Sequence, residues 1–329
     1  RYLGKSGLEL SALGFGCMTF SDGKGMFGAI GSSNGDSAQR LVDICIDHGV
    51  TLFDTADVYA EGRSEEILAG ALGSKRKDVV VATKGFFRMG KGRHDVGLSR
   101  RHLIEACDAS LRRLGTDYID LYQVHSFDSF TPLEETLHAL DDLVRSGKVR
   151  YIGLCNMAAW QIMKGLAISE RNRWSRFESV QAYYTIAGRD LEREVIPLLN
   201  DQRVGLMVWS PLAGGLLSGK FSADGKGPEG TRRATFDFPV VDKPRAFAIV
   251  EVMRPIAARH NATVAPVALA WLLSRPAVSS VIIGAKTPEQ LADNLDSSKL
   301  ELTTDDLQAL DEVSKLAPEY PGWMIERQG

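Results

Sequence analysis

The chain has 329 residues, of which 44% are hydrophobic and 25% are charged, the usual balance of a globular protein. A net charge of −3 gives no reason to expect a nucleic acid or a membrane surface as partner. No apolar run approaches the ~20 residues needed to cross a bilayer. The 4 cysteines are scattered, which argues against a zinc site or a disulfide framework and predicts a reducing, cytoplasmic location.

The N-terminal residues 2–10 predict a small β-hairpin, which would suit the closed end of a barrel. Residues 12–20 then predict a first buried strand. Its Gly14-Phe15-Gly16 is similar to the start of a dinucleotide-binding fingerprint. Thr19 stands where the third glycine belongs, however, and a Gly/Ser-rich loop follows in place of a helix, so a Rossmann site is disfavoured there.

Strand and helix patterns alternate along the rest of the chain. Apolar stretches predict further strands at residues 50–54, 79–83, 119–124, 149–154, 179–182, 204–209 and 278–283. Periodic stretches predict helices at residues 37–48, 64–72, 99–114, 132–145, 157–169, 190–200, 244–260, 264–274, 288–295 and 304–316. Four polar residues are expected to cap helices at the N-terminal end: Asp36, Ser99, Thr131 and Asp190.

Such alternation implies parallel strands joined in βαβ units. Eight units in a chain of this length predict an α/β fold, a (β/α)8 TIM barrel with an N-terminal β-hairpin and an extra C-terminal helix. We expect residues 1–329 to form a single domain. A doubly wound sheet in two domains is the alternative.

Polar side chains follow three of the predicted strands. Asp54 ends the second strand with Tyr59 just beyond it, Lys84 follows the third strand, and His125 follows the fourth. In a barrel of parallel strands the chemistry lies at this C-terminal end of the strands. Each residue alone would pass for a loop or turn residue, but together they make a set suited to proton transfer.

Five segments carry a resemblance to the aldo-keto reductase family: FDTADVY, VATK, RLGTDYIDLYQVH, VWSPLAGGLLSGK and IIGAKTPEQLADN. They occur in the order and at the spacings of that family. The chain is most similar to the bacterial and potassium-channel-β-subunit-like branches. The resemblance implies an enzyme, an NADP(H)-dependent oxidoreductase of the alcohol dehydrogenase or carbonyl reductase type, acting on an aldehyde, a ketone or the corresponding alcohol.

The resemblance carries the family's catalytic tetrad onto Asp54, Tyr59, Lys84 and His125. Tyr59 would be the general acid or base, and a nearby Lys84 ammonium would favour its phenolate. Asp54 would pair with Lys84. His125 would donate a hydrogen bond to the substrate oxygen, with a role as the acid itself as the alternative.

The resemblance also implies NADP(H) lying across the top of the barrel. No metal is expected, because His125, His48 and Asp54 lack the spacing of metal ligands. Asn156 and Gln181 match residues that bind the nicotinamide carboxamide, and Trp209 matches the aromatic residue that stacks on the ring. The loop at the pyrophosphate corresponds to Ser210, Pro211, Leu212, Gly214, Leu216 and Lys220, with Arg232 as a second cation. The segment around the adenosine corresponds to Gly284, Lys286, Gln290, Asp293 and Asn294.

The chain departs from the family at the 2′-phosphate. Gly284-Ala285-Lys286 replaces Lys-Ser-Val, and Gln290 stands where Arg is usual. Lys286 would take over the phosphate contact, so we expect NADPH in preference to NADH. Cys155 stands where a Ser is common, which removes one hydroxyl group next to the carboxamide.

Substrate, reaction direction and oligomeric state are left open, with a homo-oligomer as one possibility. Apolar candidates for the substrate pocket, half of which we expect to be packing, are Met18, Phe20, Phe27, Phe86, Phe87, Phe127, Met157 and Trp323. They favour a bulky or aromatic carbonyl. Two other functions stay open: an NADP(H)-sensing regulatory subunit with slow turnover, and a different barrel enzyme such as a metal-dependent hydrolase or an aldolase.

Overall fold

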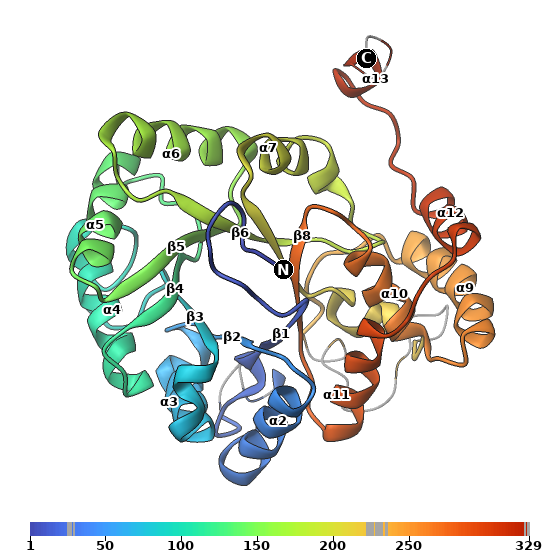
Figure 1. Ribbon diagram of the computed structural model, residues 1–329, viewed down its shortest axis with the longest axis horizontal. Coiled ribbons are helices and arrows are strands. Elements are labelled where there is room, and N and C mark those ends of the chain that lie inside the picture. Colours follow the sequence, from blue (N-terminus) through green and yellow to red (C-terminus); the bar gives the residue numbers. More distant parts are fainter. Residues whose placement is uncertain are drawn as a thin grey trace.

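Eight parallel strands close into a barrel in the order β1-β2-β3-β4-β5-β6-β7-β8 in the computed structural model. The structure describes residues 1–24, 28, 30–221, 227, 233, 236–325 and 327. Each strand pairs in parallel with the next one, and β8 pairs with β1 to close the ring. Helices surround this ring (Figure 1). The predicted (β/α)8 TIM barrel is therefore confirmed.

The strands lie within or close to the predicted stretches, but the first one is shorter than residues 12–20, because the chain leaves the sheet after Gly16 in a 3-10 turn. They are β1 Leu13–Gly16, β2 Leu52–Asp54, β3 Val80–Gly85, β4 Ile119–Val124, β5 Val149–Cys155, β6 Phe177–Tyr183, β7 Gly205–Trp209 and β8 Val278–Ile283. Almost every strand residue is buried, because one face points into the barrel and the other packs under the helices. The strands are therefore largely apolar, and two of their polar residues, Asp54 and Lys84, lie at or near C-terminal strand ends.

The α-helices among the described residues are α2 Gly35–Asp47, α3 Arg63–Leu72, α4 Arg100–Leu114, α5 Leu133–Arg145, α6 Ala159–Asn172, α7 Val195–Gln202, α9 Lys243–Arg259, α10 Val264–Leu273, α11 Pro288–Leu295, α12 Thr304–Val313 and α13 Gly322–Ile325. Short 3-10 turns add η1 Cys17–Thr19, η2 Tyr59–Gly62, η3 Gly73–Asp78, η4 Asp190–Glu192, η5 Ala213–Ser218 and η6 Asp296–Ser298. The extra C-terminal helix is present as α12.

Of the predicted N-terminal helix caps, only one is found where it was expected. Ser99 caps α4 as predicted, with its hydroxyl accepting from the His102 N–H. The cap of α2 is Asn34 rather than Asp36. Thr131 does not cap α5, because its hydroxyl donates to Asp128 instead. Asp190 begins the 3-10 turn η4, and helix α7 starts only at Val195.

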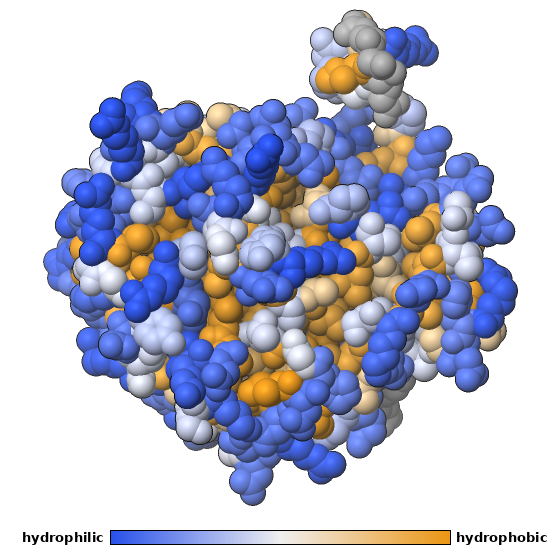
Figure 2. Space-filling view, viewed as in Figure 1, coloured by the Kyte–Doolittle hydropathy of each residue, from blue (hydrophilic) through white to orange (hydrophobic). Residues whose placement is uncertain are grey.

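The N-terminal hairpin covers the end of the barrel at which the strands begin. Its two arms join through the Tyr2–Glu9 bridge, and Leu3 and Leu10 are buried against the lower barrel interior, including Leu52 and Met207. Figure 1 shows the chain start over the middle of the ring. Figure 2 shows hydrophilic side chains along most of the rim of this face and pale or hydrophilic ones over its middle, with apolar side chains visible between the two. The open end is therefore the opposite one, where the strands finish.

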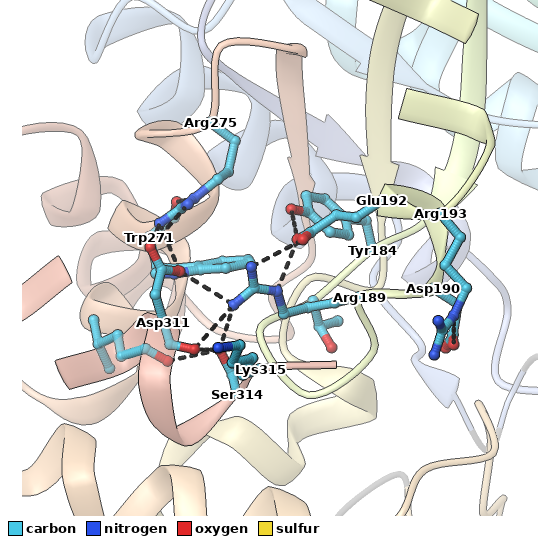
Figure 3. A network of polar contacts seen from close by, with 12 residues as sticks. Tyr184, Arg189, Asp190, Glu192, Arg193, Trp271, Arg275, Asp311, Ser314 and Lys315 are labelled. Carbon is cyan, nitrogen blue, oxygen red and sulfur yellow. Dashed lines mark hydrogen bonds and ion pairs between the residues drawn. The ribbon is translucent and has the colours of Figure 1, made fainter. Parts of the chain in front are cut away.

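A polar network attaches the C-terminal helix α12 to the barrel wall (Figure 3). The guanidinium of Arg189 donates to Glu192, to Asp311 of α12 at 3.1 Å and to Ser314 at 2.8 Å. It also lies against the buried ring of Trp271, whose indole N–H donates to Asp311. Beyond this network α13 stands away from the barrel (Figure 1).

Candidate active site

Four side chains meet at the ends of β2, β3 and β4. Asp54 is the last residue of β2, Lys84 lies near the end of β3, and His125 directly follows β4. Alternation along a strand places every second residue inside the barrel. Asp54 and Lys84 hold such inward positions, whereas Tyr59 comes from the turn η2 that follows β2.

Asp54 and Lys84 form a buried ion pair. The Lys84 Nζ donates to the Asp54 Oδ2 at 2.6 Å and to the backbone oxygen of Thr55 at 2.7 Å. Burial acts to lower the pKa of Lys84, but Asp54 and Tyr59 outweigh it, so the pKa is raised and the side chain stays an ammonium ion. A buried charge without these partners would be strongly disfavoured. The pair therefore places a permanent cation inside the barrel mouth.

Tyr59 lies over this cation. Its ring centroid is 5.0 Å from the Lys84 Nζ and 5.9 Å from the ring centroid of His125. Burial raises the pKa of the phenol; Lys84 acts to lower it, and Asp54 acts to raise it further. Lys84 does oppose the rise, as the sequence suggests, but the net shift is upward. Tyr59 is therefore a neutral phenol near pH 7, the form that can give a proton.

His125 is a neutral imidazole in this setting. Burial holds its pKa well below the ordinary value, and the nearby Lys84 cation acts in the same direction. The ring of Phe87 meets it edge-on with centroids 4.8 Å apart. A neutral imidazole retains one N–H, so His125 can donate a hydrogen bond but is a poor source of a proton. This favours the hydrogen-bonding role over the acid role.

The ends of β5, β6 and β7 carry two side-chain amides and an indole. Asn156 follows β5 with a left-handed backbone (φ 55°), accepts from the Trp209 indole N–H at 2.9 Å and donates to the His125 carbonyl at 3.2 Å. Gln181 of β6 is buried and donates to the Asp54 Oδ1 at 2.7 Å. Asn156, Gln181 and Trp209 thus lie around the same barrel mouth as the ion pair.

The sequence model of the aldo/keto reductase family matches residues 12–315. The chain belongs to the aldo/keto reductase family. A versiconal hemiacetal acetate reductase of Aspergillus parasiticus is 36% identical to it over 346 residues, covering 97% of this chain and 98% of that protein. A probable voltage-gated potassium channel subunit beta of Arabidopsis thaliana is 37% identical over 304 residues, covering 89% of each chain. The uncharacterized oxidoreductase YrpG of Bacillus subtilis is 35% identical over 327 residues, covering 95% of this chain and 94% of that protein.

As an aldo/keto reductase, the chain is an oxidoreductase of a family that acts on carbonyl compounds and generally uses nicotinamide cofactors, usually NADP(H). No helix within the described residues is long and apolar enough to cross a membrane. Among those same residues, no three His, Cys, Asp or Glu side chains are grouped to hold a metal ion.

The residues of this aldo/keto reductase suit a nicotinamide nucleotide along the β7 and β8 ends. After Trp209, the loop turns sharply through Ser210, with φ 50°, and Gly214, with φ 66°. The Ser210 hydroxyl accepts from the Gly214 N–H at 3.1 Å. A Cβ at Gly284, after β8, would meet nothing within 4 Å, so the chain leaves open space there. Since β7 and β8 are neighbours, both loops leave the same side of the barrel mouth.

The residues expected around the adenosine lie on or next to α11. Thr287 caps this helix, Lys286 is exposed, and its backbone N–H donates to Gln290. Asn294 is buried and donates to the Gly284 carbonyl, whereas Asp293 accepts from Thr263. Pro211 and Leu216 are buried in the β7 loop, Leu212 is partly buried and Lys220 is exposed. Arg232 lies outside the described residues.

The next residue, Arg233, has a structural role that the sequence did not suggest. It is buried, and its guanidinium donates to the backbone oxygens of Ala213 and Pro239 and pairs with Asp237. Arg233 thereby holds the β7 loop against the segment around Pro239. This role belongs to Arg233 alone and leaves the phosphate contact expected of Arg232 a prediction.

The expected substrate-pocket residues do not all lie at the barrel mouth. Phe87 faces His125, and Phe127 lies against Trp160 with ring centroids 6.2 Å apart. Phe20 and Met157 are core residues, and Trp323 is wrong as a pocket residue, because it lies on α13, away from the barrel. Phe27 lies outside the described residues. A pocket of about 300 Å³ opens beside the barrel mouth between the β4–α5 loop and α6, and no tetrad residue lines it.

Proposed function

We propose that this protein is an NADP(H)-dependent reductase of aldehydes or ketones, able to oxidise the corresponding alcohols, and that its chain acts as a single domain. The observation that carries the proposal is the buried Asp54–Lys84 pair with the Tyr59 ring above it. A buried charged pair under a phenol at a strand end is costly for stability, whereas the same arrangement suits proton transfer.

Each residue of the tetrad then has one task. When bound, the nicotinamide supplies the hydride that reaches the carbonyl carbon. Tyr59 gives its phenolic proton to the carbonyl oxygen, and Lys84 stabilises the phenolate that remains. Asp54 keeps Lys84 charged and in place, while His125 donates a hydrogen bond that orients the carbonyl.

Because the pKa of Tyr59 is raised, the pH should decide whether reduction or oxidation is favoured. Reduction needs the protonated phenol, which is present at neutral pH and lost only above the ordinary tyrosine value of about 10. Oxidation of an alcohol needs the phenolate and should therefore increase toward alkaline pH. At neutral pH the protein is expected to work as a reductase.

The direct test is Tyr59→Phe with a panel of aromatic and aliphatic aldehydes and ketones. We expect NADPH consumption by the unchanged protein, and a loss of kcat of at least about 100-fold in the variant, because a general acid contributes about 10²–10⁴-fold. NADPH binding, followed by tryptophan fluorescence, should be retained. A variant that keeps most of its rate would contradict the acid role of Tyr59.

Lys286→Ala tests the choice of NADPH over NADH. Lys286 is the exposed cation directly before the cap of α11, where a helix N-terminus also favours a phosphate group. Removing it should raise the KM for NADPH about tenfold, the cost of one charge-assisted hydrogen bond, and leave the KM for NADH nearly unchanged. An equal effect on both cofactors would rule out Lys286 as the phosphate contact.

A second function is favoured by one comparison. Relatives named as probable potassium channel subunits beta, from Arabidopsis thaliana and Oryza sativa, are 37% and 36% identical to this chain. A regulatory subunit that senses NADP(H) would bind the cofactor and turn over slowly. Tight NADPH binding without turnover of any carbonyl in the panel would favour this function over the reductase.

A further inference from the structure

Gln123 is a buried polar residue inside the barrel, and no role in the proposed reaction accounts for it so far. It is fully buried in β4, two residues before His125. In the sheet it lies in register with Lys84 on one side and Gly153 on the other. An uncharged polar side chain at such a position loses its contacts with water and needs partners within the protein.

The Gln123 side chain contacts Asp54 of β2, Cys155 of β5 and Gln181 of β6. The Gln123 Nε2 donates to the Asp54 Oδ1 at 3.2 Å, and its Oε1 accepts from the Gln181 Nε2 at 3.4 Å and from the Cys155 Sγ at 3.8 Å. Gln181 also donates to the same Asp54 oxygen at 2.7 Å. Gln123 therefore touches both the residue that holds Lys84 and a residue of the cofactor side.

The carboxylate decides how both amides are oriented. An ionised carboxylate only accepts hydrogen bonds, so Gln123 and Gln181 must each present their NH2 group to Asp54. The Gln123 oxygen then faces away from Asp54 and receives the second donor of Gln181. As a result, the Gln181 oxygen is directed away from Asp54.

The neighbouring strand leaves space for this arrangement. A Cβ on Gly153 would lie 3.2 Å from the Gln123 Cγ and 2.3 Å from the Ser179 Oγ. Any other residue at position 153 would therefore displace the Gln123 side chain or Ser179. The space for Gln123 is built into the barrel, independently of its hydrogen bonds.

We propose that Gln123 is a positioning residue that fixes the Asp54 carboxylate and the Gln181 amide in one buried array, and so couples cofactor binding to the proton-transfer residues. This inference rests on the proposed function, since it assigns Gln181 to the nicotinamide side. Without Gln123, the Gln181 amide keeps its bond to Asp54 but loses its second acceptor, so its orientation is less firmly fixed and cofactor affinity falls. Asp54 also loses a donor, so more of its negative charge acts on Tyr59.

The test is a double-mutant cycle of Gln123→Met and Gln181→Met, read as the Kd for NADPH from tryptophan fluorescence. Each single variant should raise the Kd about three- to tenfold, as for one lost hydrogen bond. The Kd of the double variant should lie within about twofold of the higher of the two single-variant Kd values, because the effects of substitutions within one array are not additive. Gln123→Glu, which is close in shape, gives a second route if Gln123→Met does not fold.

The pH profile separates positioning from a merely structural role. The groups that act on Tyr59 are Lys84, Asp54 and Cys155. Gln123→Met should reduce kcat and move the alkaline limb of the reductase profile upward by at least about half a pH unit, because a more negative surrounding disfavours the phenolate. Gln123→Glu should move it in the same direction.

Ser169→Ala is the control, since it removes a hydrogen bond of another fully buried residue, at 3.0 Å to the Ser175 carbonyl, but outside the barrel interior. It should lower the melting temperature while leaving the Kd and the alkaline limb unchanged. Additive effects on the Kd in the cycle, or an alkaline limb that stays in place in both Gln123 variants, would overturn the inference. The proposed function would still stand if the unchanged protein turns over carbonyl substrates. If the unchanged protein does not bind NADPH, the proposed function fails and the inference fails with it.

Discussion

Asp57 lies just outside the tetrad and has no hydrogen bond of good geometry to either carboxylate oxygen, although it is fully buried. Burial raises its pKa to about 7; Glu65 acts to raise it further, whereas the Val58 backbone N–H, Arg113 and Lys84 act to lower it. Glu65 itself is satisfied, with Thr83 donating to it at 2.6 Å and Arg113 at 2.6 Å. Arg113 is therefore shared between two carboxyl groups and cannot neutralise both.

Asp57→Asn should change how stability depends on pH. The unfolded pKa is about 3.9, so the folded state binds the proton more tightly. The resulting stabilisation is complete below about pH 4 and is lost as the pH rises through about 7. The amide of the variant does not titrate and loses no stability in this way. Relative to the unchanged protein, the unfolding free energy of the variant should therefore rise by on the order of a few kcal/mol as the pH goes from 5 to 8. Urea unfolding at several pH values measures this, and parallel pH curves for the two proteins would contradict it.

Among the elements, the turn η2 places Tyr59. Ala60 and Glu61, directly after it, have left-handed φ values of 48° and 55°, and Gly62 follows at 92°. Left-handed conformations are disfavoured for residues with a Cβ, so the surrounding structure must hold this turn. A Cβ on Gly62 would lie 2.6 Å from the Arg113 side chain, which requires glycine at that position. The close packing of α3 and α4 behind the turn thus sets where the phenol lies.

The attachment of α12 can be tested with Arg189→Met. Its guanidinium is mostly buried, and its loss removes the ion pairs and hydrogen bonds that it makes with Glu192 and Asp311 (Figure 3). The unfolding free energy should fall by about 2–4 kcal/mol in urea unfolding. Arg101→Met is the control, because its pair with Glu105 has side chains 63% and 56% exposed and should contribute little. Equal losses in the two variants would show that the network does not stabilise the fold.

For the molecule as a whole, the closed ring leaves one end for the hairpin and the other for chemistry. Lower interior residues such as Leu52, Leu121 and Met207 pack under the hairpin, whereas Asp54, Gln123 and Trp209 lie two positions further along the same strands. Each of these strands therefore changes from apolar to functional within two residues. The barrel both holds the fold together and aligns the site.

Leu3→Ala tests the hairpin's part in global stability. Leu3 is fully buried against the barrel interior, so its truncation should cost about 2–5 kcal/mol of unfolding free energy. Tyr2→Ala, at a side chain that is 65% exposed, should cost much less. The measurement is urea unfolding of both variants. A negligible loss in Leu3→Ala would mean that the barrel is stable without its hairpin.

Local pattern, together with the family resemblance, predicted the fold class and the candidate tetrad. Apolar runs such as β4 and β8 were located within their bounds, because a strand buried on both faces leaves a continuous signal. Asp54, Tyr59, Lys84 and His125 were noticed from their places at or just after strand ends, and the family resemblance assigned them the roles of a tetrad. One further signal was present: Gln123 shares the inward side of its strand with Leu121 and is polar where apolar residues are expected.

Only the tertiary structure decided the properties that depend on distant neighbours. The upward pKa shift of Tyr59 results from how deeply the fold buries it, which no spacing along the chain reveals. The array of Asp54, Gln123 and Gln181 joins three strands that are far apart in sequence. Likewise, Arg233 was assigned its role, and Trp323 was removed from the pocket, by contacts and position in space. Sequence order carries periodicity and residue type, whereas burial, orientation and partnership arise only when the barrel closes.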